Sequence, residues 1–203
     1  MKTCLILPDR YVQTDYVNLH ADRRLYHILN IVSFLIGIAI IAVGWLWKGF
    51  DSLVALALRG LSGYLLRVLE FAVCAIAYLA LHELKHGLFM RLFSGIRAHH
   101  GRKGLLLFTY SEVYFCRRDF LIIMLAPVLI FFVAFAVPAV FLEREWFWLF
   151  MLLQVINLGG SVGDFYLAGR ALRQPKNALF LSVGVSLTVY TEKNDEKHTD
   201  SGM

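Results

Sequence analysis

Charged residues are scarce in this sequence. Only 17% of its 203 residues are Asp, Glu, Lys or Arg, whereas 59% are hydrophobic. A water-soluble domain of this length needs more polar surface to cover its core, so the composition favours a membrane protein with several spans. The net charge of +5 at pH 7 would suit nucleic acid, but the basic residues stand beside apolar runs, as membrane topology requires. We therefore expect the lipid bilayer, and not nucleic acid, as a partner.

Cysteine is scarce as well. Cys4, Cys74 and Cys116 are far apart, form no CxxC motif and are odd in number, which argues against a disulfide framework. We expect free thiols in or beside a membrane. A signal peptide is not expected at the start either, because the first apolar run is short and ends at Pro8 and Asp9. Membrane insertion should therefore depend on internal spans.

Long apolar stretches predict about four transmembrane helices. The four stretches are residues 28–47, 61–81, 120–142 and 146–163. The second contains Arg67 and Glu70, which are three positions apart and can pair on one helix face. This second helix should continue to about residue 93, so that it extends beyond the apolar stretch that begins it.

Other stretches predict shorter elements. Residues 105–115 are rich in aromatic and β-branched residues, which favours a strand. Residues 179–190 alternate, so a single strand is expected with one face formed by Leu179, Leu181, Val183, Val185, Leu187 and Val189. The lead-in at 11–30 is expected to be partly helical, and residues 52–63 to form a short interfacial helix. The polar tail at 191–203 is expected to be disordered, which leaves residues 1–190 as one membrane-embedded domain.

Lysine and arginine are distributed unevenly between the connections. They cluster ahead of the first span, between the second and the third, and after the fourth, whereas the other two connections carry few. Cytoplasmic loops carry an excess of Lys and Arg, so both termini are expected in the cytoplasm.

The motif "HELKH" at the end of the second span has metal-ligand spacing. His82 and His86 are four residues apart, so they share one helix face and can both reach one ion. Glu83 follows the first histidine and can contact a metal-bound water. HExxH on a helix is the zincin arrangement, in which zinc lowers the pKa of its water to about 7 and the glutamate acts as general base. The alternative is an interfacial polar patch at the cytosolic end of this span.

A catalytic zinc needs a third protein ligand, and Asp164 is the best candidate. It follows the fourth span, where a carboxylate without a cation would be costly. His86 and Asp164 each precede a basic residue of the cytosolic side by five or six positions, so they should lie at a similar depth. His99 and His100, in a loop, are the other candidates. Asn157, nearly two turns before Asp164, could orient substrate or donate to an oxyanion.

These motifs resemble the site-2 protease class of intramembrane zinc metalloproteases, and more closely a family of small bacterial membrane proteins classed as zincin peptidases. The resemblance covers most of the chain and includes "LPDRYVQTDYVNLH", "HELKHG", "YFCRRDFLIIMLAP", "NLGGSVGD" and "SVGVSLTVY". It implies Zn²⁺ bound by His82, His86 and Asp164, with Glu83 as general base. It also implies a location in the bacterial inner membrane, and the distribution of Lys and Arg predicts an active site near the cytosolic face.

The resemblance further implies a peptide or transmembrane-protein substrate. In site-2 proteases a strand beside the active site pairs with an unwound substrate, and residues 109–115 would be its counterpart here. This chain departs from the site-2 pattern at the third ligand: it has glycines and then Asp164-Phe165, where that class carries prolines and an Asp-Gly pair.

The expected fold is therefore an all-α polytopic membrane protein of about four transmembrane helices, with a short β element near the active site. A membrane-embedded zinc metalloprotease is the leading hypothesis for its function. A non-catalytic membrane protein, in which zinc ties two spans together in an accessory or scaffold role, is the alternative. A metal transporter is disfavoured because the first and third spans contain no ionisable residue.

Overall fold

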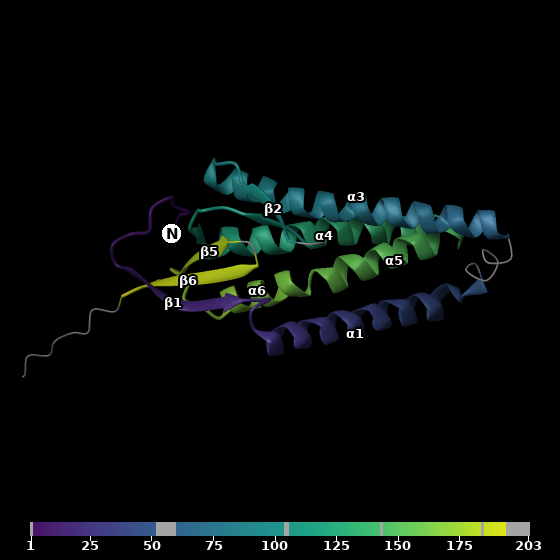
Figure 1. The fold of residues 1–203 in the computed structure, drawn as a ribbon, viewed down its shortest axis with the longest axis horizontal. Helices are drawn as coiled ribbons and strands as arrows, with labels where there is room; N and C mark the ends of the chain where they lie inside the picture. The colour runs from purple at the N-terminus through teal and green to yellow at the C-terminus, as the bar shows by residue number, and fades with distance from the viewer. Residues whose placement is uncertain (1, 52–59, 104–105, 143, 184, 194–203) are drawn as a thin grey trace, which may run out of the picture.

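The computed structural model describes residues 2–51, 60–103, 106–142, 144–183 and 185–193. Within them the helices are α1 (Arg23–Lys48), α3 (Leu61–Ser94), α4 (Arg117–Phe141), α5 (Arg144–Gly160) and α6 (Val162–Leu172). The strands are β1 (Tyr11–Asn18), β2 (His99–Lys103), β3 (Leu106–Tyr110), β4 (Phe115–Cys116), β5 (Leu179–Val183) and β6 (Ser186–Glu192). The helices form an elongated bundle, and the strands gather at one end of it (Figure 1).

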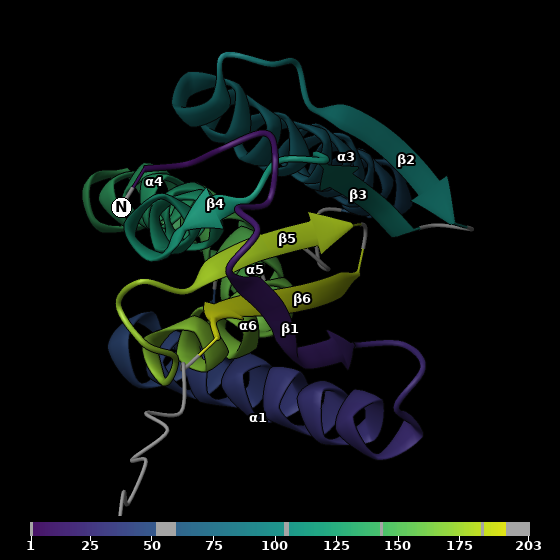
Figure 2. The same ribbon diagram turned by 90° about the vertical axis from the view of Figure 1, so that its left-hand side faces the viewer.

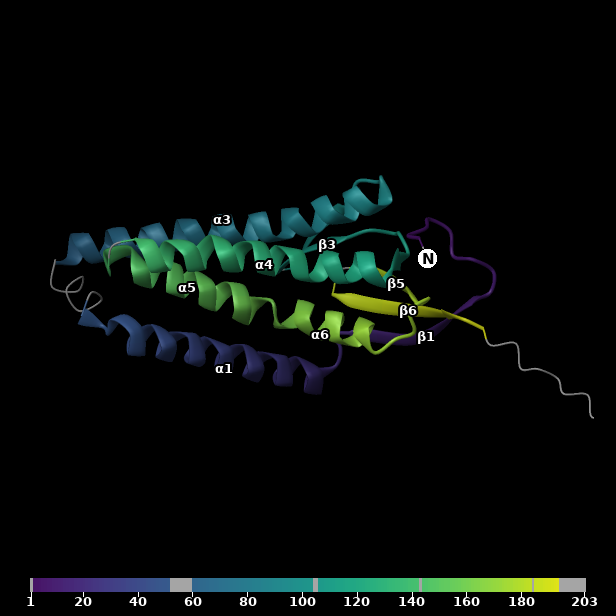
Figure 3. The same cartoon turned by 180° about the vertical axis from the view of Figure 1, so that it is seen from behind.

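Three helices, α1, α3 and α4, are each long and apolar enough to cross a membrane, in agreement with the first three predicted spans. The fourth predicted span, residues 146–163, differs, because it covers α5 and only the start of α6, and the two helices meet at a bend of 41° (Figure 3). If this bent pair counts as one span, the fold has four, which is consistent with a multi-pass membrane protein. The expected pair of Arg67 and Glu70 is present, with 2.8 Å between Nη1 and Oε2.

Helix α3 is longer than a bilayer requires. Its 34 residues span about 51 Å at 1.5 Å per residue, whereas the hydrocarbon core is about 30 Å thick. The helix ends where Gly95 adopts a left-handed conformation at φ 74° and its N–H bonds to the carbonyl of Arg91. As predicted, the "HELKH" motif therefore lies within one continuous helix.

The strands form two separate antiparallel sheets. One has the order β1-β6-β5-β4, and the other consists of the hairpin β2–β3, which lies over α3 (Figure 2). Strand β1 was not predicted, since residues 11–30 were expected to be partly helical. Residues 11–18 instead pair with β6, and a helix begins only at Arg23, where the Asp22 side chain accepts a hydrogen bond from the Leu25 N–H.

The prediction of a single strand over residues 179–190 is wrong. The segment forms two strands, β5 and β6, in which Phe180 pairs with Val189 and Ser182 with Leu187. Directly paired residues share a sheet face, so Leu187 and Val189 lie opposite to the face predicted from continuous alternation. The chain reverses between the strands, and the reversal shifts which positions face the core.

Two predictions concern residues near the gaps in the described chain. The interfacial helix expected at 52–63 lies largely outside the described residues, although α3 begins at Leu61. The tail was expected to begin at residue 191, but Thr191 and Glu192 belong to β6 and pair with β1. Residues 194–203 lie outside the described part of the chain.

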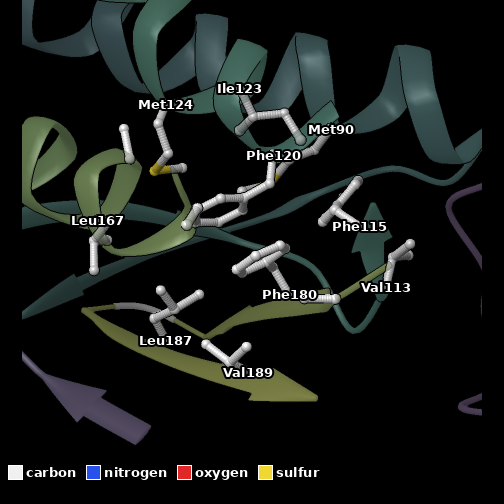
Figure 4. Packing of buried hydrophobic residues seen from close by; sticks show 13 residues of the cluster. Met90, Val113, Phe115, Phe120, Ile123, Met124, Leu167, Phe180, Leu187 and Val189 are labelled. Carbon is white, nitrogen blue, oxygen red and sulfur yellow. The ribbon is translucent and has the colours of Figure 1, made fainter. Parts of the chain in front are cut away.

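The main hydrophobic core lies between the four-stranded sheet and the ends of α3, α4 and α6. Its side chains point toward one another from these elements (Figure 4). The labelled members are Met90, Val113, Phe115, Phe120, Ile123, Met124, Leu167, Phe180, Leu187 and Val189. Because Met90 lies one turn after His86 and Leu167 lies three residues after Asp164, the same core fixes the two helix segments that carry the predicted metal ligands.

Candidate metal centre

Three predicted ligands converge from two helices. His82 and His86 lie one turn apart on α3, and Asp164 lies in the first turn of α6. The two Nε2 atoms are 3.1 Å apart, and Oδ2 of Asp164 is 3.4 Å from His82 Nε2 and 3.7 Å from His86 Nε2. Among the described residues, these three form the group that could hold a metal ion.

The spacing of these atoms suits zinc. In a tetrahedral site with bonds of about 2.0–2.1 Å, neighbouring ligand atoms lie about 3.4 Å apart, and the three separations here are 3.1, 3.4 and 3.7 Å. Two imidazoles and one carboxylate are a ligand set of catalytic zinc sites, which keep a fourth position for water or substrate. The residues present therefore fit a catalytic zinc.

Each histidine is held by a partner on its other ring nitrogen. Nδ1 of His86 lies 2.9 Å from the carbonyl oxygen of Ile123 on α4, so it must carry the proton and donate. Nδ1 of His82 lies 3.1 Å from the Tyr78 hydroxyl, which itself donates to Oδ1 of Asn157 at 3.0 Å. The hydroxyl proton is used by Asn157, so His82 Nδ1–H donates to Tyr78. Both Nε2 lone pairs therefore point to the metal position. Hydrogen-bond partners on the other ring nitrogen commonly orient metal-binding histidines in this way.

Asn157 lies behind Tyr78 in this chain of hydrogen bonds. Its side chain is fully buried, and its amide nitrogen lies 3.2 Å both from the carbonyl oxygen of Val128 and from Oε1 of Gln154. The donor and the acceptor of the amide are thus engaged within the protein. The substrate-positioning or oxyanion role expected for Asn157 stays a prediction, while the contacts show that it orients Tyr78.

Glu83 faces the β2–β3 hairpin from the helix turn between the two histidines. Its Oε2 lies 2.9 Å from the Thr109 hydroxyl on β3. The two histidines considered as third ligands also lie on this hairpin, and in the described structure neither joins the metal group. His100 instead contacts Thr109 through Nδ1 at 2.9 Å, and His99 stacks on Tyr110.

A cavity of about 440 Å³ adjoins the metal centre. It is lined by residues of α1, α3, α6 and β3, and His82, Glu83, His86 and Asp164 are among them. Gly160, at the end of α5, also lines this cavity, and an added Cβ there would have no atom within 4 Å. The bend between α5 and α6 therefore lies at the edge of this cavity, where Gly160 is exposed.

The contacts of Tyr78 and Thr109 with the site were not predicted from the sequence, although residues 109–115 were expected to form a strand beside it. Tyr78 could have been found, because it precedes His82 by four positions and so lies on the same helix face. Thr109 offered no such signal, since it is 26 positions from Glu83 and meets it only after the hairpin folds back onto α3. A long-range contact of this kind depends on tertiary structure rather than on local spacing.

Comparison with known proteins shows the family to which this chain belongs. The family described as "Putative zincin peptidase" matches residues 75–179, more than half of the chain, a range that contains the three metal-capable residues and Glu83. The searches of curated proteins and of solved structures gave no match. A zincin family implies zinc as the metal, and His82, His86 and Asp164 form a group that could bind it. The chain belongs to this zincin peptidase family.

Proposed function

We propose that the protein is a membrane-embedded zinc metalloprotease that hydrolyses peptide bonds in or near the membrane. The observation that carries this proposal is the convergence of His82, His86 and Asp164, with atom separations of 3.1–3.7 Å, beside Glu83 and an adjoining cavity. Membership of a zincin peptidase family supports the same chemistry. Apolar helices on which the ligands lie support a site within the membrane.

Each residue of the site has a distinct role in this proposal. His82, His86 and Asp164 would hold the zinc, which would supply a water with a pKa lowered to about 7. Glu83 would be the general base, whose carboxylate would take up a proton during the attack and later give it to the amine of the departing peptide. Tyr78 and the carbonyl of Ile123 keep the two imidazoles in the tautomer that the metal requires.

The substrate is proposed to be a peptide or an unwound segment of a transmembrane protein. Strand β3 pairs with β2 on one edge, and among the described strands none pairs with its other edge. Phe108 and Thr109 of β3 line the cavity beside the metal centre. An extended peptide could therefore add to this edge by β-augmentation, which would present its backbone to Glu83 and the zinc.

A non-catalytic role is the competing proposal. The buried histidines come from α3 and the carboxylate from α6, so a zinc here would also tie these two helices together. A purely structural zinc normally has four protein ligands, whereas this group has three among the described residues. The open cavity and the adjacent Glu83 favour catalysis, and the following experiment separates the two roles.

The test uses purified full-length protein and a model transmembrane substrate. Glu83→Gln should keep zinc at the wild-type stoichiometry and lose cleavage by roughly 100-fold or more, because the general base is removed. Asp164→Ala should lose zinc as well as cleavage. Glu112→Gln, a change at an exposed carboxylate, is the matched control and should leave both unchanged. Cleavage by Glu83→Gln at the wild-type rate, or full zinc content in Asp164→Ala, would overturn the proposal.

A further inference from the structure

The Thr109 hydroxyl connects the hairpin to Glu83 through three short contacts. Its oxygen lies 2.9 Å from Oε2 of Glu83, 3.0 Å from the backbone carbonyl oxygen of the same residue and 2.9 Å from Nδ1 of His100. Thr109 is 6% exposed, whereas His100 is an exposed residue, so the hydroxyl is buried between α3 and a histidine at the surface of the hairpin. The hydroxyl thus ties the carboxylate of Glu83 to its own helix turn.

The chemistry of the three partners sets the direction of the hydrogen bonds. An ionised carboxylate and a carbonyl can only accept, so the single hydroxyl proton of Thr109 must go to Glu83. The contact with His100 then requires the imidazole to donate from Nδ1 to the hydroxyl oxygen. His100, Thr109 and Glu83 therefore form one chain of hydrogen bonds, in which each bond polarises the next.

The same hydroxyl can serve Glu83 after it has accepted a proton. The protonated carboxyl would donate from Oε2 to Thr109, and the Thr109 proton would turn to the carbonyl oxygen of Glu83, which is already 3.0 Å away. Oγ1 can accept two bonds, one from Glu83 and one from His100. All three side chains would keep hydrogen-bond partners in both states.

The hairpin can reach α3 because Gly87 has no side chain. A Cβ at Gly87 would lie 2.8 Å from Cε1 of His100 and 3.4 Å from Cγ2 of Thr109. His100 and Thr109 are direct cross-strand partners, so their side chains lie on the same face of the hairpin. That face of the hairpin is turned to α3. Gly87, which follows His86, lets the hairpin approach the helix closely.

We propose that Thr109, supported by His100, is a positioning residue that holds the Glu83 carboxylate beside the metal centre. The hairpin β2–β3 is then part of the catalytic apparatus. This inference rests on the proposed function, because it concerns the general base of that reaction. It predicts that an uncharged change at Thr109, the penultimate residue of β3, alters turnover without altering the metal site.

The kinetic test compares two changes at one position. Thr109→Val keeps the shape of the side chain but removes the hydroxyl, and it should lower kcat roughly 10- to 100-fold with KM and zinc content unchanged, because the base is no longer oriented. Thr109→Ser keeps the hydroxyl and should retain kcat within about threefold. His100→Phe should also lower kcat, whereas His99→Phe, on the opposite face of β2, should not. Equal kcat in Thr109→Val and wild type would overturn the inference.

A second measurement does not depend on cleavage. In protein labelled with ¹⁵N-histidine, the Nδ1 resonance of His100 is identified by its loss in His100→Phe. Glu83→Gln should shift this resonance although Glu83 does not touch His100, because the charged end of the hydrogen-bond chain is neutralised. An unshifted resonance in Glu83→Gln would refute the coupling. Should no substrate be cleaved by the wild type, the proposed function fails while this measurement still decides the hydrogen-bond chain.

Discussion

Tyr78 illustrates, at the scale of single residues, how the site depends on groups that never touch the metal position. Its hydroxyl accepts from Nδ1 of His82 and donates to Asn157, and all three side chains are buried. A buried polar group left without a partner costs about 1–3 kcal/mol. The orientation of His82 therefore depends on a hydrogen-bond chain that begins on α5, at Asn157.

Tyr78→Phe tests this dependence. The change removes only the hydroxyl, so His82 Nδ1 and Asn157 each lose a partner while the packing of the ring is preserved. We expect zinc affinity to fall about 10- to 100-fold, as for other outer-partner changes, when measured by competition with a chelator. Tyr64→Phe, at an exposed position on the same helix, is the control and should bind zinc as the wild type does. An unchanged affinity in Tyr78→Phe would show that the hydroxyl does not orient His82.

The grouping of His82, His86 and Asp164 was also what the sequence predicted best. The separation of His82 and His86 by four positions predicts a shared helix face, and the cost of a carboxylate among apolar residues singles out Asp164. Both inferences need only local geometry and solvation. The partners Thr109 and Ile123 could not be inferred in this way, because hairpin packing and the approach of α4 bring them to the site.

At the scale of elements, the bend between α5 and α6 is the feature that shapes the site. Asp164 lies in the first turn of α6, just after the bend, so its direction differs from that of a residue on a straight continuation of α5. Sequence reasoning expected one span over residues 146–163, because an apolar run reports length and not direction. The same limit explains β5 and β6, where alternation continues through a chain reversal.

Two adjacent glycines before the bend provide a matched pair for a test. A Cβ at Gly159 would lie 3.1 Å from Oγ and 3.3 Å from the backbone oxygen of Ser33 on α1, whereas a Cβ at Gly160 would meet nothing within 4 Å. We expect Gly159→Ala to destabilise the protein by about 1–3 kcal/mol through overpacking of α1 against α5. Gly160→Ala should be neutral, or stabilising by up to about 1 kcal/mol through helix propensity.

The measurement is the unfolding free energy of each variant in detergent, with the zinc content determined in parallel. Equal stability of the two alanine variants would contradict the close packing of α1 and α5. Because Gly160 faces the cavity, its alanine variant also reports whether a small loss of space beside the ligands affects turnover.

At the scale of the whole molecule, the strands and the described chain ends lie at the same end of the bundle (Figure 1). Basic residues at the beginning of α1 and α4 and at the end of α3 and α6 also lie at that end of the bundle. They include Arg23, Arg24, Arg91, Arg117, Arg118 and Arg170. Cytoplasmic connections carry such an excess, so we predict that the sheet end faces the cytoplasm.

Reporter fusions in a bacterial host test this orientation. A green fluorescent protein fused after Met203 should fluoresce, since it folds in the cytoplasm, and alkaline phosphatase fused there should be inactive. Alkaline phosphatase fused after Asp51, beyond the end of α1, should be active outside. The opposite pattern would place the sheet end outside.

His86 lies about 12 Å along α3 from Ser94 at the sheet end, at 1.5 Å per residue. The predicted orientation would thus place the metal-capable residues close to the cytosolic surface.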